Sequence, residues 1–170
     1  MGSSLVVRLE RYLAHENIRT PQRTRFVGKP GLTFGGLKEL LDAALSLEGT
    51  GRVILHVGAN DIGRLDDYSW FKELEAAFFY LKVRYPGYSA FWSDMLPRAN
   101  WRYRSHYLCE KKRRRLWRRA RGLFYTEGEG VIRHPELCSA NYWDLISNDG
   151  VHLSDIGNQA FWNDFQILYS

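Results

Sequence analysis

A short apolar run, RVILHV, extends from Arg52 to Val57 and is the feature that most constrains the fold of this chain. Glycines bound it on both sides, in GTG before it and in GANDIG after it. Its apolar residues are consecutive and do not alternate with polar ones, which is typical of a strand covered on both faces of a parallel sheet. We interpret His56, inside this run, as a hydrogen-bonded core residue.

Helical and strand patterns alternate along the rest of the chain. Apolar residues recur at helical spacing in residues 5–15, 37–45, 71–81 and 154–168, and short strands are predicted at 88–92 and 131–134. Such alternation predicts an α/β fold, a three-layer α/β/α sandwich with a mostly parallel, flavodoxin-like sheet. At 170 residues the chain is expected to form one domain over 1–170. Ligands bind beyond the carboxyl ends of such strands, so the turns there are the places to search.

Cysteine content and hydropathy bear on the compartment. Cys109 and Cys138 are the two cysteines, too few for a disulfide framework. The N-terminal residues lack the apolar core of a signal peptide, and no stretch approaches the roughly 18 apolar residues that span a bilayer. The sequence therefore predicts a soluble intracellular protein, in the cytoplasm, with no membrane span.

Three short segments place polar groups at turns. The first, Gly2-Ser3-Ser4, directly precedes the first predicted helix, where the helix dipole favours developing negative charge on a serine hydroxyl. An ordinary helix N-cap is the competing interpretation of this serine.

The second segment is Gly58-Ala59-Asn60-Asp61-Ile62-Gly63, immediately after the apolar strand. The side-chain amide of Asn60 can project over the strand end and donate a hydrogen bond to a developing oxyanion. A plain turn explains the same residues equally well, because Asn, Asp and Gly are common in turns.

The third segment, Asn148-Asp149-Gly150-Val151-His152, precedes the last predicted helix. An Asp and a His three residues apart on a loop can hydrogen-bond, which fixes the imidazole tautomer and leaves its other nitrogen free as a base.

Taken together and in this order, these segments resemble the SGNH (GDSL-like) hydrolases and esterases. The resemblance implies a serine esterase without a cofactor, acting on a small ester or acetylated group. It implies Ser4 as nucleophile, His152 as base and Asp149 as its orienting acid. It also implies an oxyanion hole formed by the Ser4 backbone N–H, the Gly31 backbone N–H and the Asn60 side chain, with Gly35 as a rival to Gly31.

The chain departs from the family pattern in two places. Ser3 stands where the family's G-D-S block has Asp, and the family's first strand, which should precede Gly2, is missing. These departures favour a second hypothesis, a catalytically impaired SGNH-like binding module. The segments FWSDMLPRANWR and DGVHLSDIGNQAFW also resemble SGNH domains encoded in DIRS-like retroelements.

The net charge of +5 is concentrated in one predicted helix. The rest of the chain has 16 basic and 19 acidic residues and is mildly acidic. Trp101, Tyr103 and Trp117 add aromatic surfaces, so nucleic-acid binding is one hypothesis for this helix, and a solvated helix face is the competing one. Its eight basic residues are Lys111, Lys112, Arg113, Arg114, Arg115, Arg118, Arg119 and Arg121.

A zinc site is a further alternative. His106 and Cys109, with His134 and Cys138, could in principle supply four zinc ligands. No C-x-x-C accompanies them, and small buried cysteines are common in protein cores, so we predict no metal.

Overall fold

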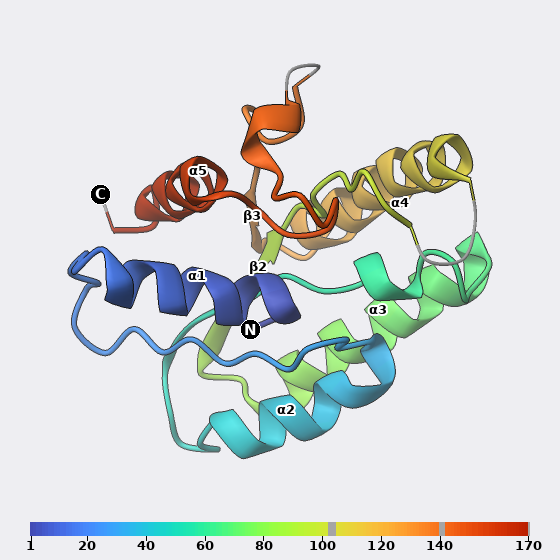
Figure 1. Ribbon diagram of the computed structural model, residues 1–170. Coiled ribbons are helices and arrows are strands. Elements are labelled where there is room, and N and C mark those ends of the chain that lie inside the picture. The colour runs from blue at the N-terminus through green and yellow to red at the C-terminus, as the bar shows by residue number, and fades with distance from the viewer. Residues whose placement is uncertain (102–104, 140–141, 170) are drawn as a thin grey trace.

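Parallel strands form the centre of the computed structural model, which describes residues 1–101, 105–139 and 142–169. Among these residues the sheet has three strands, β1 (Gly51–Leu55), β2 (Tyr88–Ser93) and β3 (Gly130–Ile132), in the order β1-β2-β3. Both strand pairs are parallel. A helix lies in each connection, as a parallel sheet requires (Figure 1). The predicted α/β fold with a parallel sheet is confirmed.

Five α-helices surround the sheet in the described part of the chain. Three of them begin at a side-chain cap: Asp66, Ser105 and Ser154 each accept a hydrogen bond from a backbone N–H in the first turn. No helix of the described residues is both long enough and apolar enough to cross a membrane. The helices are α1 (Ser4–His15), α2 (Leu37–Ala44), α3 (Asp67–Arg84), α4 (His106–Thr126) and α5 (Asp155–Gln166), with 3-10 turns η1 (Phe34–Gly36), η2 (Ala59–Asp61) and η3 (Tyr142–Leu145).

The basic helix α4 continues past Gly122 to Thr126. Phe124, fully buried, packs edge-on against Phe78 of α3 with ring centroids 4.8 Å apart. Burial of that aromatic side chain holds the last turn in place despite the low helix propensity of glycine.

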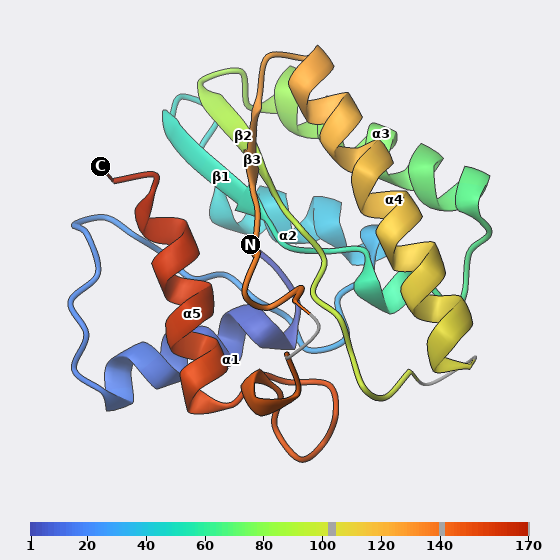
Figure 2. The ribbon, with the colours of Figure 1, turned by 90° about the horizontal axis from the view of Figure 1, so that it is seen from above.

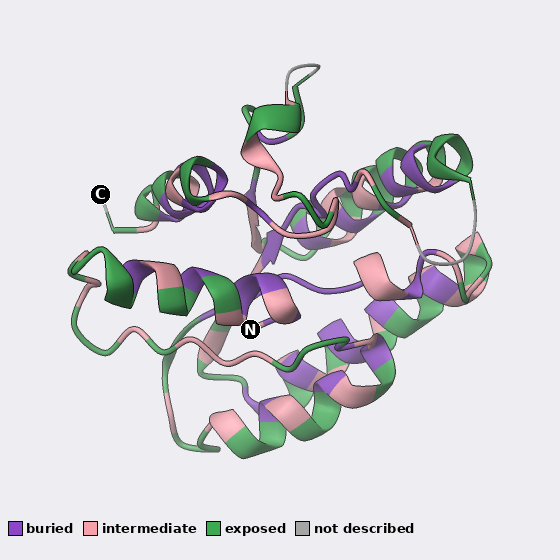
Figure 3. Ribbon diagram, viewed as in Figure 1, coloured by how far each residue is buried: buried purple, intermediate pink, exposed green. Residues whose placement is uncertain are grey.

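The helices cover both faces of the sheet and so make three layers (Figure 2). On one face α2, α3 and α4 pack around Leu55 and Trp92, and on the other α1 and α5 enclose a second apolar cluster that includes Leu9 and Phe161. Buried residues accordingly line the sides of the helices that face the sheet (Figure 3).

Met1 and Gly2 lie beside β1 where a further strand would run. Gly2 makes parallel bridges with His56 on one side and Gly28 on the other. The Met1 carbonyl accepts from the His56 N–H at 2.8 Å, and the Gly2 N–H donates to the Val27 carbonyl at 3.0 Å. Gly2 therefore forms a single-residue bridge between two neighbouring backbones.

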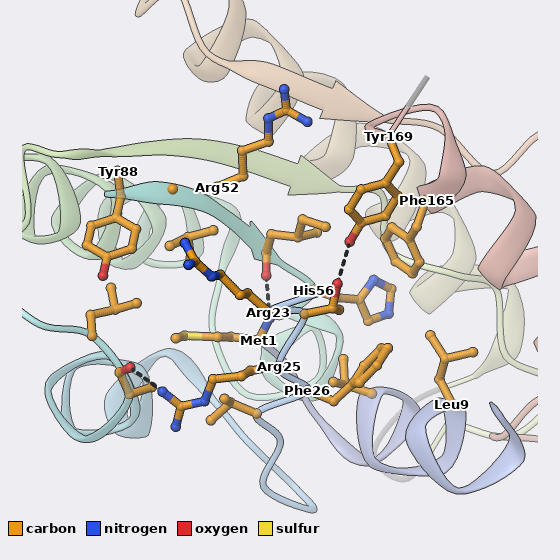
Figure 4. A pocket seen from close by; sticks show the side chains of 18 of the residues that line it. Met1, Leu9, Arg23, Arg25, Phe26, Arg52, His56, Tyr88, Phe165 and Tyr169 are labelled. Carbon is orange, nitrogen blue, oxygen red and sulfur yellow. Dashed lines mark hydrogen bonds between the residues drawn. The ribbon is translucent and has the colours of Figure 1, made fainter. Parts of the chain in front are cut away.

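A cavity of about 470 Å³ continues from Met1 along the edge of β1 (Figure 4). Arg52 lines it from β1, and Arg23 and Arg25 line it from the segment opposite. The cavity is therefore bounded by β1 on one side and by the segment that carries Arg23 and Arg25 on the other.

A buried polar network joins the carboxyl ends of all three strands to α5. His56 Nδ1 lies 2.9 Å from Ser93 Oγ, which lies 2.8 Å from His134 Nε2, and His134 Nδ1 lies 2.8 Å from Asp164 Oδ2. His56, Ser93 and His134 are all buried. The interpretation of His56 as a hydrogen-bonded core residue is confirmed.

Candidate active site

Ser4, His152 and Asp149 lie in hydrogen-bonding contact although 144 residues of chain separate the first from the other two. His152 Nε2 lies 2.8 Å from Ser4 Oγ, and His152 Nδ1 lies 2.6 Å from Asp149 Oδ2. The imidazole is 17% exposed and the carboxylate 42% exposed, so the constellation opens to solvent. With Nδ1–H donating to Asp149, Nε2 is free to accept the serine proton.

The loop that carries Asp149 and His152 is held by its own backbone. Asp149 Oδ1 accepts from the N–H groups of Val151 and His152, both at 2.9 Å, and from Ser147 Oγ at 2.8 Å. This Asx turn aims the other carboxylate oxygen at the imidazole. Gly150 has φ +71°, a conformation that favours glycine, and its carbonyl accepts from the Asn100 N–H.

The carboxylate of Asp149 is stabilised in its charged form. Partial burial acts to raise its pKa, but the hydrogen bonds from the backbone and side chain of His152, the Val151 N–H and Ser147 together hold the pKa well below its usual range. Arg8, one helical turn after Ser4, lies 3.5 Å from the same carboxylate. Asp149 is therefore ionised wherever the protein is folded near neutral pH.

Ser4 is the first residue of α1, and its hydroxyl contacts His152 rather than capping the helix. Ser3 occupies the N-cap position, buried and without a side-chain capping bond. The interpretation of Ser4 as an ordinary N-cap is therefore wrong. At this position its backbone N–H belongs to the first turn, where helical N–H groups lack intrahelical partners and can bind negative charge.

Asn60, in η2, is tied to the loop that carries Gly31. Its Nδ2 donates to the Leu32 carbonyl at 2.9 Å, and the neighbouring Asp61 carboxylate accepts from the Phe34 N–H at 3.2 Å. Burial raises the pKa of Asp61, opposed by hydrogen bonds from Arg64 and Phe34. An asparagine amide has two N–H groups, so one remains for a ligand after the bond to Leu32.

Gly31 and Gly35 differ in conformation. Gly31 is exposed and has φ +72°, while Gly35 lies within η1. The loop around Gly31 is joined to the start of the chain, because the Lys29 N–H donates to the Gly2 carbonyl at 3.1 Å. The two proposed oxyanion donors, Gly31 and Asn60, thus belong to segments in mutual contact.

Arg98 and Asn100 are functional candidates that the sequence interpretation did not single out. The Arg98 guanidinium donates twice to Asn60 Oδ1, each at 3.1 Å, and the Asn100 N–H donates to Gly150 at 2.9 Å. Both lie in the segment FWSDMLPRANWR, but spacing alone does not indicate which turns a loop will meet.

The basic helix α4 is not a uniform solvated face. Arg113 is buried and pairs with Glu110 at 2.8 Å, Arg121 pairs with Asp94, and Lys112 and Arg115 contact Asp67. Four basic side chains, Lys111, Arg114, Arg118 and Arg119, are exposed, and Arg118 and Arg119 lie over aromatic rings.

The aromatic, histidine and cysteine residues considered from the sequence lie mostly near α4 and after β3. Trp101 Nε1 donates to Glu110, so its indole takes part in the packing near α4, and Tyr103 lies outside the described residues. Both ring nitrogens of His134 are engaged in the buried network. Cys109 is buried and Cys138 exposed, and neither forms a disulfide within the described part of the chain.

Comparison with known proteins places the fold. No protein-family model and no curated protein matches the sequence. Solved structures do match. A Streptococcus pneumonia protein described as a platelet activating factor has a TM-score of 0.79 at 24% identity, over 99% of this chain and 81% of the other.

Two further structures extend the comparison. A protein from Desulfitobacterium hafniense described as a lipolytic protein of the G-D-S-L family has a TM-score of 0.71 at 15% identity, over 97% of this chain and 94% of its own. The OSK domain of Drosophila Oskar has a TM-score of 0.70 at 18% identity, over 98% of this chain and 85% of its own. At these identities the likeness shows the fold, and this chain has the fold of the GDSL-type (SGNH) lipolytic and acylhydrolase proteins.

Proposed function

We propose that this chain is a serine esterase that hydrolyses a small ester or acetyl group. The observation that carries the proposal is the pair of contacts made by His152, one to Ser4 Oγ and one to Asp149 Oδ2. A serine hydroxyl is a weak nucleophile until a base removes its proton, and a neutral imidazole oriented by a carboxylate is that base.

In the proposed reaction Ser4 Oγ attacks the ester carbonyl carbon while its proton passes to His152 Nε2. The tetrahedral intermediate collapses, the C–O bond to the alcohol breaks, and His152 returns the proton to the leaving oxygen. Water then attacks the acyl-serine by the same route, which releases the acid and restores Ser4. Asp149 keeps its charge throughout and stabilises the imidazolium.

The proposed oxyanion donors are the Ser4 backbone N–H, the Gly31 backbone N–H and the remaining N–H of Asn60. Removing one such donor typically costs about 10²–10³ in kcat. The position of Ser4 at the start of α1 and the contact between Asn60 and the Leu32 loop support these assignments.

The proposal is tested by hydrolysis of p-nitrophenyl acetate by the chain and by Ser4→Ala. We expect turnover that is lost in Ser4→Ala and kept in Ser46→Ala, an exposed serine in the turn after α2. A fluorophosphonate should label the chain at Ser4 and leave Ser4→Ala unlabelled, as read by mass spectrometry.

Absence of turnover and of labelling in a folded chain would contradict the esterase proposal. That outcome would favour the binding-module hypothesis. Retention on nucleic acid that falls with salt and depends on the exposed Lys111, Arg114 and Arg118 would then be the next measurement.

A further inference from the structure

Asn60 is held by two groups of opposite hydrogen-bonding character. The Leu32 carbonyl can only accept, and the Arg98 guanidinium can only donate. The Asn60 amide satisfies both in one orientation, with Nδ2 toward Leu32 at 2.9 Å and Oδ1 toward the two guanidinium nitrogens at 3.1 Å. Turning the amide by 180° would set N–H groups against the guanidinium and oxygen against oxygen.

The Arg98 contact also polarises the amide. A guanidinium stays charged at all relevant pH values, and both of its hydrogen bonds end on the same carbonyl oxygen. A cation at Oδ1 draws electron density from the amide and makes its N–H groups better donors. Arg98 is buried, so the charge acts with little screening by solvent.

Arg98 is itself held firmly. Its backbone N–H donates to Glu110 Oε1 at 3.1 Å, and its guanidinium lies 5.2 Å from the centre of the Trp101 ring. Trp101 Nε1 donates to the same Glu110 oxygen, and Glu110 pairs with the buried Arg113. The start of α4 therefore anchors the arginine that fixes Asn60.

The same segment reaches the loop of the proposed base. Two residues after Arg98, the Asn100 N–H donates to the Gly150 carbonyl at 2.9 Å, between Asp149 and His152. One short piece of chain thus contacts both Asn60 and the loop that presents the imidazole.

We propose that Arg98 is a positioning residue that orients and polarises the Asn60 amide as an oxyanion donor. This inference rests on the proposed esterase function. Because Arg98 is proposed to act through Asn60, its effect should fall on kcat and should vanish when Asn60 has no amide.

A double-mutant cycle with p-nitrophenyl acetate tests this. Arg98→Met keeps an unbranched stem and removes the charge and the guanidinium donors. We expect it to lower kcat by about 10-fold or more with KM changed by less than about 2-fold, and Asn60→Ala to lower kcat by about 10²–10³. In the Asn60→Ala background, Arg98→Met should cost less than about 2-fold.

Arg98→Lys retains the charge and should recover part of the loss, while Arg19→Met, an exposed arginine in the loop after α1, should leave kcat unchanged. Equal costs of Arg98→Met in both backgrounds would overturn the assignment. Thermal melts of each variant show whether it is folded. If Arg98→Met does not fold, Arg98→Lys replaces it in the double-mutant cycle.

A second readout separates this inference from the esterase proposal. In the intact chain the two Asn60 amide protons should give distinct, slowly exchanging NMR signals, assigned by their loss in Asn60→Ala. In Arg98→Lys or Arg98→Met these signals should shift and broaden. If the parent chain lacks Ser4-dependent turnover the esterase proposal fails, and unchanged Asn60 signals would separately overturn the role of Arg98.

Discussion

Ser93 Oγ lies 2.8 Å from His134 Nε2 in the core, the same separation that joins Ser4 to His152 at the surface. Each imidazole also contacts an aspartate through Nδ1. The two constellations share their connectivity and differ in access, since Ser93 is 0% exposed. Substrate cannot reach Ser93, so we assign the buried set a structural role.

Ser93→Ala is expected to destabilise the fold and leave esterase turnover unchanged. Ser93 Oγ is the hydrogen-bonding partner of one ring nitrogen of His56 and one of His134, so its loss leaves two buried ring nitrogens without that partner. The cost should be about 1–3 kcal/mol in the free energy of unfolding, measured with urea. Ser89→Ala, an exposed serine on the same strand, is the control. Loss of turnover with unchanged stability would contradict this role.

Acidification should destabilise the protein through His56. Burial lowers the pKa of His56 well below its ordinary value, and the nearby His134, Met1 amino group and Arg98 lower it further. Above about pH 6.5 His56 is neutral in both states. Below it the unfolded chain binds a proton that the native state does not, so the free energy of unfolding falls by up to about 1.4 kcal/mol per pH unit.

The matched variant for this effect is His56→Asn, whose amide can still donate to Ser93. As the pH is lowered from 6.5 to 5, the free energy of unfolding of His56→Asn should fall less steeply than that of the parent chain, as measured by urea titration. Identical slopes for the two proteins would show that His56 does not contribute.

Asp149→Asn should lower kcat by roughly 10⁴ while the loop keeps its shape. An asparagine oxygen can still accept from the Val151 and His152 N–H groups, but its amide presents a donor to Nδ1 and selects the wrong tautomer. Ser147→Ala, which removes one bond to the same carboxylate, should cost far less. Comparable losses in the two variants would argue against an orienting role for Asp149.

The pH–rate profile gives a second check on Asp149. Its depressed pKa keeps the Asp149 carboxylate ionised below the usual range of an aspartate, so the acid limb of kcat/KM should not reflect protonation of this carboxylate. Asp149→Asn should then lower the plateau without removing the acid limb.

The sequence predicts most of this fold because its signals are local. The apolar run at β1 and the apolar spacing in the helices depend on neighbouring residues alone. The order of three motifs predicts Ser4 and the Asp149–His152 pair as site residues, and the structure brings them together.

Contacts between distant segments were beyond such reasoning. Arg98 contacts Asn60 because the loop after β2 lies against the turn after β1. No periodic pattern in the sequence predicts a contact between two loops. The basic run showed the converse problem: its composition indicated a solvated face, whereas tertiary packing buries Arg113 beside Glu110.

Arg113 and Arg114 should therefore respond differently to the same substitution. Arg113→Met leaves Glu110 buried without its charge partner and removes a hydrogen bond to the Met95 carbonyl. The cost should be about 3–5 kcal/mol in the free energy of unfolding. Arg114→Met, on the exposed side of α4, should change it by less than about 0.5 kcal/mol. Equal small effects would mean that the pair contributes little.

Residues added before Met1 should stabilise the chain if they can form a strand. Burial lowers the pKa of the Met1 amino group to about 5 from 8.0, so at pH 7 keeping it uncharged costs about 1.4 kcal/mol, and more as the pH falls toward 5. Any extension turns this amine into a neutral amide. A Val-Val-Val-Ile extension can in addition enter the cavity beside β1 and pair with both bounding backbones.

A Gly-Ser-Gly-Ser extension is the matched control, since it also removes the buried amine but has low strand propensity. Both extensions should flatten the pH dependence of stability between pH 8 and 5, and the Val-Val-Val-Ile extension should have the higher Tm. Each kcal/mol gained corresponds to about 2–4 °C for a chain of this size. Equal melting temperatures for the two extensions would show that the cavity does not accept a strand, because the amine effect is common to both.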